Sequence, residues 1–271
     1  MYRIGWFSTG RDEAARDLLS AAVKALKKGD AKVTIEFVFC SREPGESPDS
    51  DAFIKQVQNY GLPLVCFSYQ KFKDGTKDTS VTSGFPEWRL AYDREGMNRL
   101  RDFQPDLCVL AGYMLIVGPE MCTRYTMVNL HPALPSGPTG TWQEVIWQLM
   151  AQRASETGAM MHMVTPELDR GPVVTYCRFS IRDDGFASLW QQLKDKSVSD
   201  IKEAEGKRNA LFVLIREEGL KREFPLIIAT IKAFGEGQVR VEAGKVLDAC
   251  GKIIAGYDLT CEIDRLVSRA R

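Results

Sequence analysis

The chain has 271 residues, enough for one large domain or for one domain with an appendage. Its 36 Lys and Arg residues balance 36 Asp and Glu residues, so it lacks the global positive field that attracts nucleic acid. The 7 cysteines form no CxxC motif, which argues against a disulfide framework and a structural zinc site. Because no signal peptide and no apolar run of membrane-spanning length are evident, we expect a cytoplasmic protein without a membrane or nucleic-acid partner.

The N-terminal half alternates short apolar runs with amphipathic segments. We predict strands at Tyr2–Phe7, Val33–Phe39, Pro63–Phe67, Asp106–Gly112 and Val128–His131, and helices at Glu13–Lys27, Asp51–Tyr60 and Leu90–Phe103. Nearly continuous apolar strands alternating with helices are typical of a sheet buried on both faces. The pattern therefore predicts a Rossmann-like α/β fold with a mostly parallel sheet. The polar segment from Lys71 to Pro86 is expected to be a loop with Lys71, Lys73 and Lys77 in solvent.

The second half begins with a predicted helix at Trp142–Gln152. Strands at Ala159–Val164 and Val173–Ile181 are expected to form an antiparallel pair around Asp169. The remainder is predicted as a charged helical region at Gly185–Glu218, an apolar helix at Phe224–Phe234, and short strands at Val239–Val241 and Lys252–Tyr257. No linker divides the chain. We expect a catalytic domain over residues 1–184 and an extension over 185–271 packed on the same domain.

The chain's 2 histidines, His131 and His162, fall in a stretch rich in other polar groups. Asn129 and His131 are two residues apart, so on a strand they share a face, and Asp169 follows later. A carboxamide can hold an oxyanion, an imidazole can move protons at neutral pH, and a carboxylate can orient the imidazole or fix a water. Such a set suits acyl or formyl transfer through a tetrahedral intermediate. The sequence has no GxSxG elbow and no cysteine beside either histidine, so it gives little support to a covalent nucleophile.

Each polar residue also has a purely structural interpretation. Asn129 and His131 at a strand end are compatible with a capped turn. Asp169, before Gly171 and Pro172, fits an ordinary turn residue. His162 lies between two methionines, which fits a buried, hydrogen-bonded histidine.

Taken together, these stretches resemble the folate-dependent formyltransferases, most closely the branch that formylates glycinamide ribonucleotide. The resemblance rests on Leu110–Met114, Asn129–Pro135 (NLHPALP), Thr157–Val164 and Thr165–Val174, with weaker support from Arg89–Arg94 and Phe224–Ile228. The Asn–His–Asp order with its flanking residues is the most specific part. The resemblance covers most of the chain.

The resemblance implies a role for each residue of the set. Asn129 would hold the formyl oxygen, His131 would assist the tetrahedral intermediate, and Asp169 would orient His131 and manage the amine proton through water. The implied formyl donor is 10-formyltetrahydrofolate, and no metal is required. The substrate- and cofactor-binding residues implied are Ser8, Thr9, Gly10, Arg11, Arg89, Met114, Leu115, Ile116, Val117 and His162.

The match is weaker on the acceptor side. The family's phosphate loop is glycine-rich, whereas Ser8–Glu13 contains one glycine and two acids, so a plain strand–helix turn is equally compatible. Leu115 stands where the purine enzyme often has Arg, and Ser136–Trp142 replaces a histidine-bearing stretch. Trp142 is expected to pack its helix onto the sheet. An insertion between Gly185 and Lys221 displaces substrate-contacting acids, for which Glu217 or Glu218 are candidate replacements.

The resemblance favours formyl transfer to glycinamide ribonucleotide, a phosphorylated small-molecule amine of purine biosynthesis. The alternatives are transfer to another amine (an amino sugar or a modified amino acid), formyl-folate hydrolysis, and a non-catalytic folate-binding protein. Hydrolysis is disfavoured because the formyl-folate hydrolase that this chain resembles has an added N-terminal regulatory domain, which is not evident in this sequence. Formylation of initiator tRNA is disfavoured because a basic C-terminal domain is not evident. A monomer and a homodimer are both compatible with the sequence.

Overall fold

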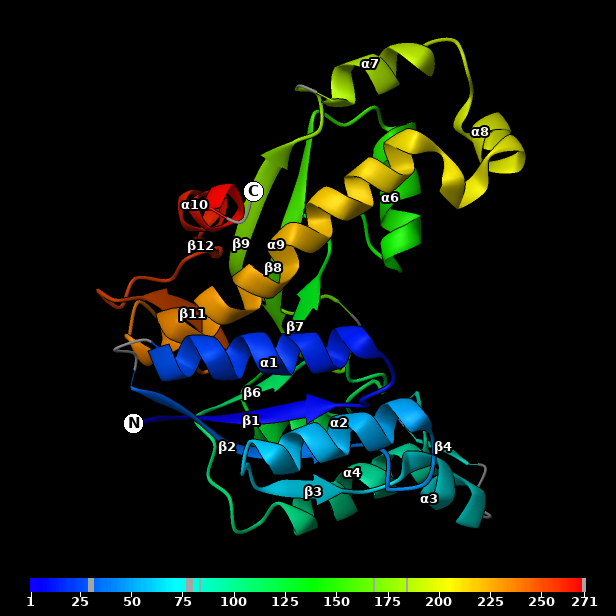
Figure 1. Ribbon diagram of the computed structural model, residues 1–271. Helices are drawn as coiled ribbons and strands as arrows, with labels where there is room; N and C mark the ends of the chain where they lie inside the picture. Colours follow the sequence, from blue (N-terminus) through cyan, green and yellow to red (C-terminus); the bar gives the residue numbers. More distant parts are fainter. Residues whose placement is uncertain (29–31, 77–79, 83, 168, 184, 270–271) are drawn as a thin grey trace.

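The fold is built on an 8-stranded mixed sheet in the order β12-β9-β8-β7-β6-β1-β2-β3 (Figure 1). The computed structural model describes residues 1–28, 32–76, 80–82, 84–167, 169–183 and 185–269. Five neighbouring strands run parallel: β3 (Leu64–Cys66), β2 (Val33–Cys40), β1 (Tyr2–Ser8), β6 (Leu107–Leu110) and β7 (Met127–His131). Strand β8 (Glu156–Met163) is antiparallel to β7 and to β9 (Val173–Ser180), and β12 (Tyr257–Asp258) runs parallel to β9. The predicted fold class and the antiparallel pair around Asp169 are confirmed.

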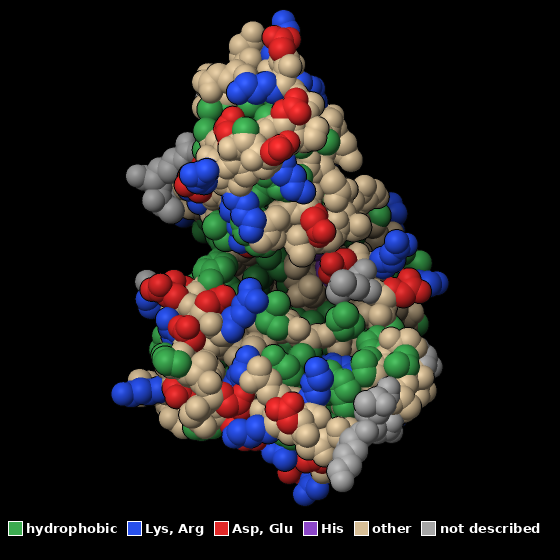
Figure 2. Space-filling model, turned by 90° about the vertical axis from the view of Figure 1, so that its right-hand side faces the viewer, with side chains coloured by type: hydrophobic (Ala, Val, Ile, Leu, Met, Phe, Trp, Pro, Cys, Tyr) green, Lys and Arg blue, Asp and Glu red, His purple; other side chains and the backbone are tan. Residues whose placement is uncertain are grey.

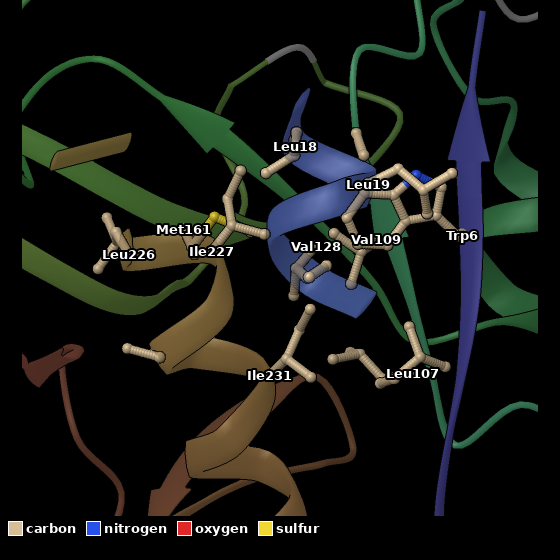
Figure 3. Packing of buried hydrophobic residues seen from close by; sticks show 14 of the residues in the cluster. Trp6, Leu18, Leu19, Leu107, Val109, Val128, Met161, Leu226, Ile227 and Ile231 are labelled. Atoms are coloured by element: carbon tan, nitrogen blue, oxygen red, sulfur yellow. The ribbon is translucent and has the colours of Figure 1, made fainter. Parts of the chain in front are cut away.

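Helices cover both faces of the sheet, as a sheet that is apolar on both faces requires. One face packs against α1 (Glu13–Lys28), α2 (Pro48–Asn59), α10 (Thr260–Arg269) and the C-terminal half of α9 (Ala210–Gly235). The other face packs against α4 (Glu87–Arg99) and α5 (Pro119–Arg124). Figure 3 shows the first of these cores, where Leu19 lies beside the strand residues Trp6 and Val109, and Ile231 points toward Val128.

A second apolar cluster lies beyond the end of the sheet. It joins α6 (Trp142–Ala151), α7 (Gly185–Gln192), α8 (Val198–Ala204) and the N-terminal half of α9. Helix α9 thus contributes Phe212 to this cluster and Leu226 to the sheet core, although Pro225 lies inside the helix. Because one helix belongs to both cores, we propose that residues 185–271 are an extension of the same domain.

The predicted loop between Lys71 and Pro86 is partly wrong. It contains most of α3 (Tyr69–Gly75) and the short strands β4 (Val81–Thr82) and β5 (Phe85–Pro86). Ser68 starts α3 by accepting a hydrogen bond from Lys71 N, a cap that polar composition alone conceals. Lys71 is exposed and pairs with Glu43 at 2.9 Å. Lys73 lies on α3 as well, whereas Lys77 lies outside the described residues.

The C-terminal strand prediction is also partly wrong. Strand β10 (Val239–Glu242) pairs with β11 (Lys245–Asp248), which was not predicted. The predicted strand Lys252–Tyr257 contributes only a single bridge from Ile253 and the first residue of β12. Asp248 Oδ1 accepts hydrogen bonds from Cys250 N and Lys252 N, so this stretch turns instead of extending. The helices α5 and α10 were not predicted.

The sheet's strand order reverses beside β1, which defines a crevice. The chain proceeds outward through β2 and β3 and then returns to β6 on the other side of β1. In open α/β sheets, ligands bind at the carboxyl ends of the strands that flank such a reversal. Here those ends lead into Thr9 and Gly112, and Thr9 N donates to Gly112 O at 3.1 Å. No helix in the described ranges has the length and hydropathy needed to cross a membrane.

Candidate active site

Strand pairing brings the predicted catalytic residues together. In the β7–β8 register Asn129 lies opposite His162, and His131 lies opposite Met160. Asp169 lies in the loop between β8 and β9. Its Oδ1 is 3.4 Å from His162 Nε2, and its Oδ2 is 3.7 Å from His131 Nδ1. The structure therefore places one carboxylate between two imidazoles.

Backbone carbonyls fix the orientation of both rings. His131 Nε2 lies 2.9 Å from Pro138 O, and His162 Nδ1 lies 2.9 Å from Met163 O. Because a carbonyl oxygen can only accept, each of these ring nitrogens carries a hydrogen. In a neutral imidazole the other nitrogen is then unprotonated, and in both rings that nitrogen faces Asp169. His131 Nδ1, His162 Nε2 and the Asp169 carboxylate can therefore share an additional proton.

Asp169 has a lowered side-chain pKa and an unusual backbone conformation. The contact with His162 is the main reason that the pKa of Asp169 is lowered, and the charge of His131 acts in the same direction against partial burial. The residue also adopts a left-handed backbone with φ of 55°, which is uncommon outside glycine and tolerated best by Asn and Asp. Such conformations persist where surrounding structure enforces them, often at functional sites.

Close packing at Gly171 supplies that enforcement. A Cβ atom built on Gly171 would lie 1.8 Å from Met163 O, so only glycine lets the loop cross β8 this closely. Next to it, Met163 N donates to Pro172 O at 2.9 Å. The glycine of the Asp-x-Gly-Pro motif thus seats the loop that presents Asp169.

The polar groups open onto an apolar cavity of about 190 Å³. Its lining residues are Leu110, Tyr113, Met114, Leu115, Ile116, Val117, Asn129, His162, Val164, Thr165 and Asp169. His131 is only 2% exposed and is not among them, so it supports the wall from behind. Met114 and Ile116 are 51% and 48% exposed, and exposed apolar groups of this size commonly mark a ligand surface.

A second hollow of about 490 Å³ continues on the other side of the segment Met114–Ile116. Phe85, Pro86, Trp88 and Arg89 contribute to it. Figure 2 shows this face of the molecule hollowed at mid-height, with hydrophobic side chains along the hollow. The two spaces share Met114, Leu115 and Ile116 and form an elongated apolar trough with one polar end. Of the residues that line the polar end, Leu110, Tyr113, Val164 and Thr165 were not predicted as binding residues, although each lies inside a quoted motif.

Arg89 was predicted to bind substrate, and the structure gives it a contact with the trough wall. It is 4% exposed, its Nε donates to Ile116 O at 2.8 Å, and its Nη2 lies 2.7 Å from Asp93 Oδ1. Asp93 Oδ2 in turn accepts from Gly118 N at 2.7 Å, and burial raises the pKa of Asp93 in spite of Arg89. Breaking a buried ion pair by removing one partner typically costs about 3–5 kcal/mol. The pair therefore fixes both ends of Ile116–Gly118.

The predicted anion loop is largely satisfied by its own hydrogen bonds. Ser8 Oγ accepts from Gly10 N at 3.1 Å, and Thr9 Oγ1 accepts from Met114 N at 3.0 Å. Arg11 is exposed and pairs with Asp12 at 3.2 Å. Within the loop, the Arg11 side chain is thus the most accessible cationic group for an acceptor anion, while Thr9 ties the loop to the trough wall.

The expected acidic replacements do not lie at this site. Glu217 is exposed, and Glu218 pairs with Arg222 in a different cavity beside α10. Glu223, which the sequence did not single out, lies with Arg216 in a small cavity next to Pro132. The expectation for Glu217 and Glu218 was wrong because the sequence alone does not show which face of α9 is turned toward the site.

Trp142 packs differently from the expectation. Its ring lies 5.9 Å from the Phe212 ring and 4.6 Å from the Arg216 guanidinium. It therefore packs α6 against α9, because the insertion places an apolar helix between α6 and solvent. No group of three or more His, Cys, Asp or Glu residues in the described part of the chain is arranged to hold a metal ion.

Comparison with known proteins assigns the family. A model of the formyl transferase family matches residues 14–200, and the chain belongs to that family. It is 29% identical over 166 residues to a phosphoribosylglycinamide formyltransferase from Escherichia coli, covering 60% of this chain and 68% of the relative. A protein of the same name from Schizosaccharomyces pombe is 27% identical over 174 residues, covering 61% and 77%.

Solved structures support the same fold. The phosphoribosylglycinamide formyltransferase from Coxiella burnetii superposes with a TM-score of 0.63 at 20% identity, covering 95% of this chain and 98% of that one. A formyltetrahydrofolate deformylase from Burkholderia mallei gives a TM-score of 0.58 at 19% identity, covering 91% and 70%.

We predict that Gly171→Ala destabilises the chain by about 1–3 kcal/mol, because the added methyl group overpacks the crossing at Met163. Thermal or chemical unfolding measures this. Gly75→Ala is the matched control, since a Cβ at Gly75 meets no atom within 4 Å. Equal stability of the two variants would show that the crossing does not constrain the loop.

We predict that Asp169→Asn removes a pH-dependent part of the stability. The lowered pKa of Asp169 means that its ionised form favours the folded state above the unfolded-state value of about 4. That contribution is lost as pH falls through the folded-state pKa. The unfolding free energy of the wild type should therefore rise relative to that of Asp169→Asn between about pH 2 and 5. Asn also tolerates the left-handed backbone. Parallel pH profiles for the two proteins would contradict the assignment.

Proposed function

We propose that this protein transfers the formyl group of 10-formyltetrahydrofolate to the amine of glycinamide ribonucleotide in purine biosynthesis. The observation that carries the proposal is the convergence of Asn129, His162 and Asp169 on one end of an apolar trough in a formyl transferase chain. The names of the E. coli and S. pombe relatives support the acceptor. We further propose that the protein works in the cytoplasm, where this metabolism takes place.

The trough suits the formyl donor. The donor is elongated, with a reduced pterin at one end and an aromatic aminobenzoyl ring in the middle, and it carries the formyl group on the nitrogen that links these two parts. The cavity beside Asn129 would take the pterin, with Leu115 and Ile116 against its face. The hollow beside Trp88 would take the aminobenzoyl portion. Arg89 and Asp93 would keep the shared wall in place, so that the formyl group meets the polar end.

The polar groups suit attack by an amine on that formyl group. The Asn129 NH2 would donate to the carbonyl oxygen as negative charge develops, a contribution worth about 3–4 kcal/mol in comparable sites. The proton released by the amine would pass, through water, to Asp169. His131 Nδ1 and His162 Nε2 both face Asp169, so the proton would be held among these three groups and returned to the departing folate nitrogen.

The acceptor would enter beside the loop Ser8–Arg11, with Arg11 toward its phosphate. A specific observation keeps the second candidate, another amine, open to test. Gly10 N is engaged by Ser8, and Asp12 Oδ1 accepts from Ala15 N in the first turn of α1, where it adds negative charge. That arrangement suits an acceptor with a less anionic end, such as an amino sugar.

We predict that Asn129→Ala lowers turnover by about 10²–10³-fold with little change in donor affinity, because the lost donor acts on the developing oxyanion. Steady-state kinetics and donor-binding titration measure the two quantities. Asn98→Ala, an exposed amide on α4, is the matched control. Turnover that is unchanged in Asn129→Ala would remove the residue from this role.

The acceptor is tested by incubating the protein and 10-formyltetrahydrofolate with individual amines and following both formyl loss and product mass. Glycinamide ribonucleotide should be formylated in preference to its dephosphorylated nucleoside and to amino sugars. Preference for an unphosphorylated amine would favour the second candidate. Formyl loss without any amine would indicate a hydrolase, and donor binding without turnover would indicate a binding protein.

A further inference from the structure

Two cysteines lie side by side at the ends of β2 and β3. Cys40 and Cys66 are in register in this parallel strand pair, and both side chains face the core beneath α1 and α2. Neighbouring strands are about 4.7–4.9 Å apart, which falls within the Cα separation of about 4.4–6.8 Å that a disulfide needs. Both residues are free thiols in the structure.

This pairing is specific to these two positions. The other cysteines within strands, Cys108 and Cys177, are in register with Met127 and Ala159 instead. The two thiols also differ in access. Cys40 is fully buried, whereas Cys66 is half-buried on β3, a three-residue strand at the edge of the sheet.

We propose that Cys40 and Cys66 form a reversible dithiol–disulfide site that reacts with small-molecule disulfides through Cys66. Hydrogen bonding by Cys40 lowers the pKa of Cys66, which favours Cys66 as the attacking sulfur. The Cys66 thiolate attacks one sulfur of the small disulfide and releases one thiol. Cys40 then attacks Cys66 Sγ and releases the second thiol. The two thiol protons leave with these products, so the small disulfide is reduced as the protein dithiol is oxidised.

Hydrogen bonds link this cysteine pair to the loop Ser8–Arg11 and, through that loop, to the trough wall at Met114. Ser41, next to Cys40, donates from Oγ to Thr9 Oγ1 at 3.0 Å, and Thr9 Oγ1 also accepts from Met114 N. Phe67 N, next to Cys66, donates to Cys40 O at 3.0 Å. A disulfide draws the Cβ atoms to about 3.5–4.5 Å, so the short strand β3 and the end of β2 must adjust. The adjustment reaches the acceptor loop through Ser41 and Thr9. This effect on activity rests on the proposed formyl transfer, whereas formation of the bond does not.

The test exposes the full chain to oxidised glutathione and follows it by intact mass and non-reducing peptide mapping. We expect the loss of two hydrogen atoms and a Cys40–Cys66 cross-linked peptide, both reversed by dithiothreitol. The double variant Cys250→Ser/Cys261→Ser, which lacks the exposed thiols, should behave as the wild type. Cys66→Ser, with Cys66→Ala as a second variant, should form no internal bond.

The consequence is measured on the same samples. Oxidation should raise the KM for the amine acceptor about threefold or more, and reduction should restore it. A stable glutathione adduct on Cys66 without the internal bond would overturn the site. The internal bond with unchanged kinetics would overturn its coupling to the acceptor loop. If the internal bond forms in a protein that transfers no formyl group, the proposed function fails and the dithiol site stands.

Discussion

The antiparallel pairing of β7 with β8 is the constraint on which the rest of the site depends. It interrupts an otherwise parallel run of strands and sets Asn129 directly opposite His162. Since β8 turns back into β9, the connecting loop brings Asp169 within 3.4 Å of His162 Nε2 and 3.7 Å of His131 Nδ1. A one-residue slip of β8 against β7 would turn His162 to the face of the sheet opposite Asn129.

Backbone interactions, more than side-chain contacts, prepare the polar groups. The carbonyls of Pro138 and Met163 hold the two imidazoles, and the Met163 carbonyl also crowds Gly171, which holds the Asp169 loop. The trough wall is also held through its backbone, because Arg89 donates to Ile116 O and Asp93 accepts from Gly118 N. Groups fixed in this way need little reorganisation when charge develops on a bound substrate.

The sequence predicts the strand–helix alternation and the Asn129–His131–Asp169 set because both depend on local patterns: apolar periodicity and a motif with fixed spacing. It could not predict that Asp169 lies nearer to His162 than to His131, because that depends on the β7–β8 register. The start of α3 at Ser68 depends likewise on capping, and the position of Glu223 next to Pro132 depends on the phase of α9. Arg89 was found by its motif, but its contacts with Asp93 and Ile116 required the packing of α4.

The most direct test of the account is a crystal structure with a stable analogue of 10-formyltetrahydrofolate bound. The account predicts that the formyl oxygen lies about 2.7–3.1 Å from Asn129 Nδ2. It also predicts one water that bridges the Asp169 carboxylate and the formyl group. A formyl group that lies outside hydrogen-bond range of Asn129, with the analogue bound outside the trough along Met114–Val117, would contradict it.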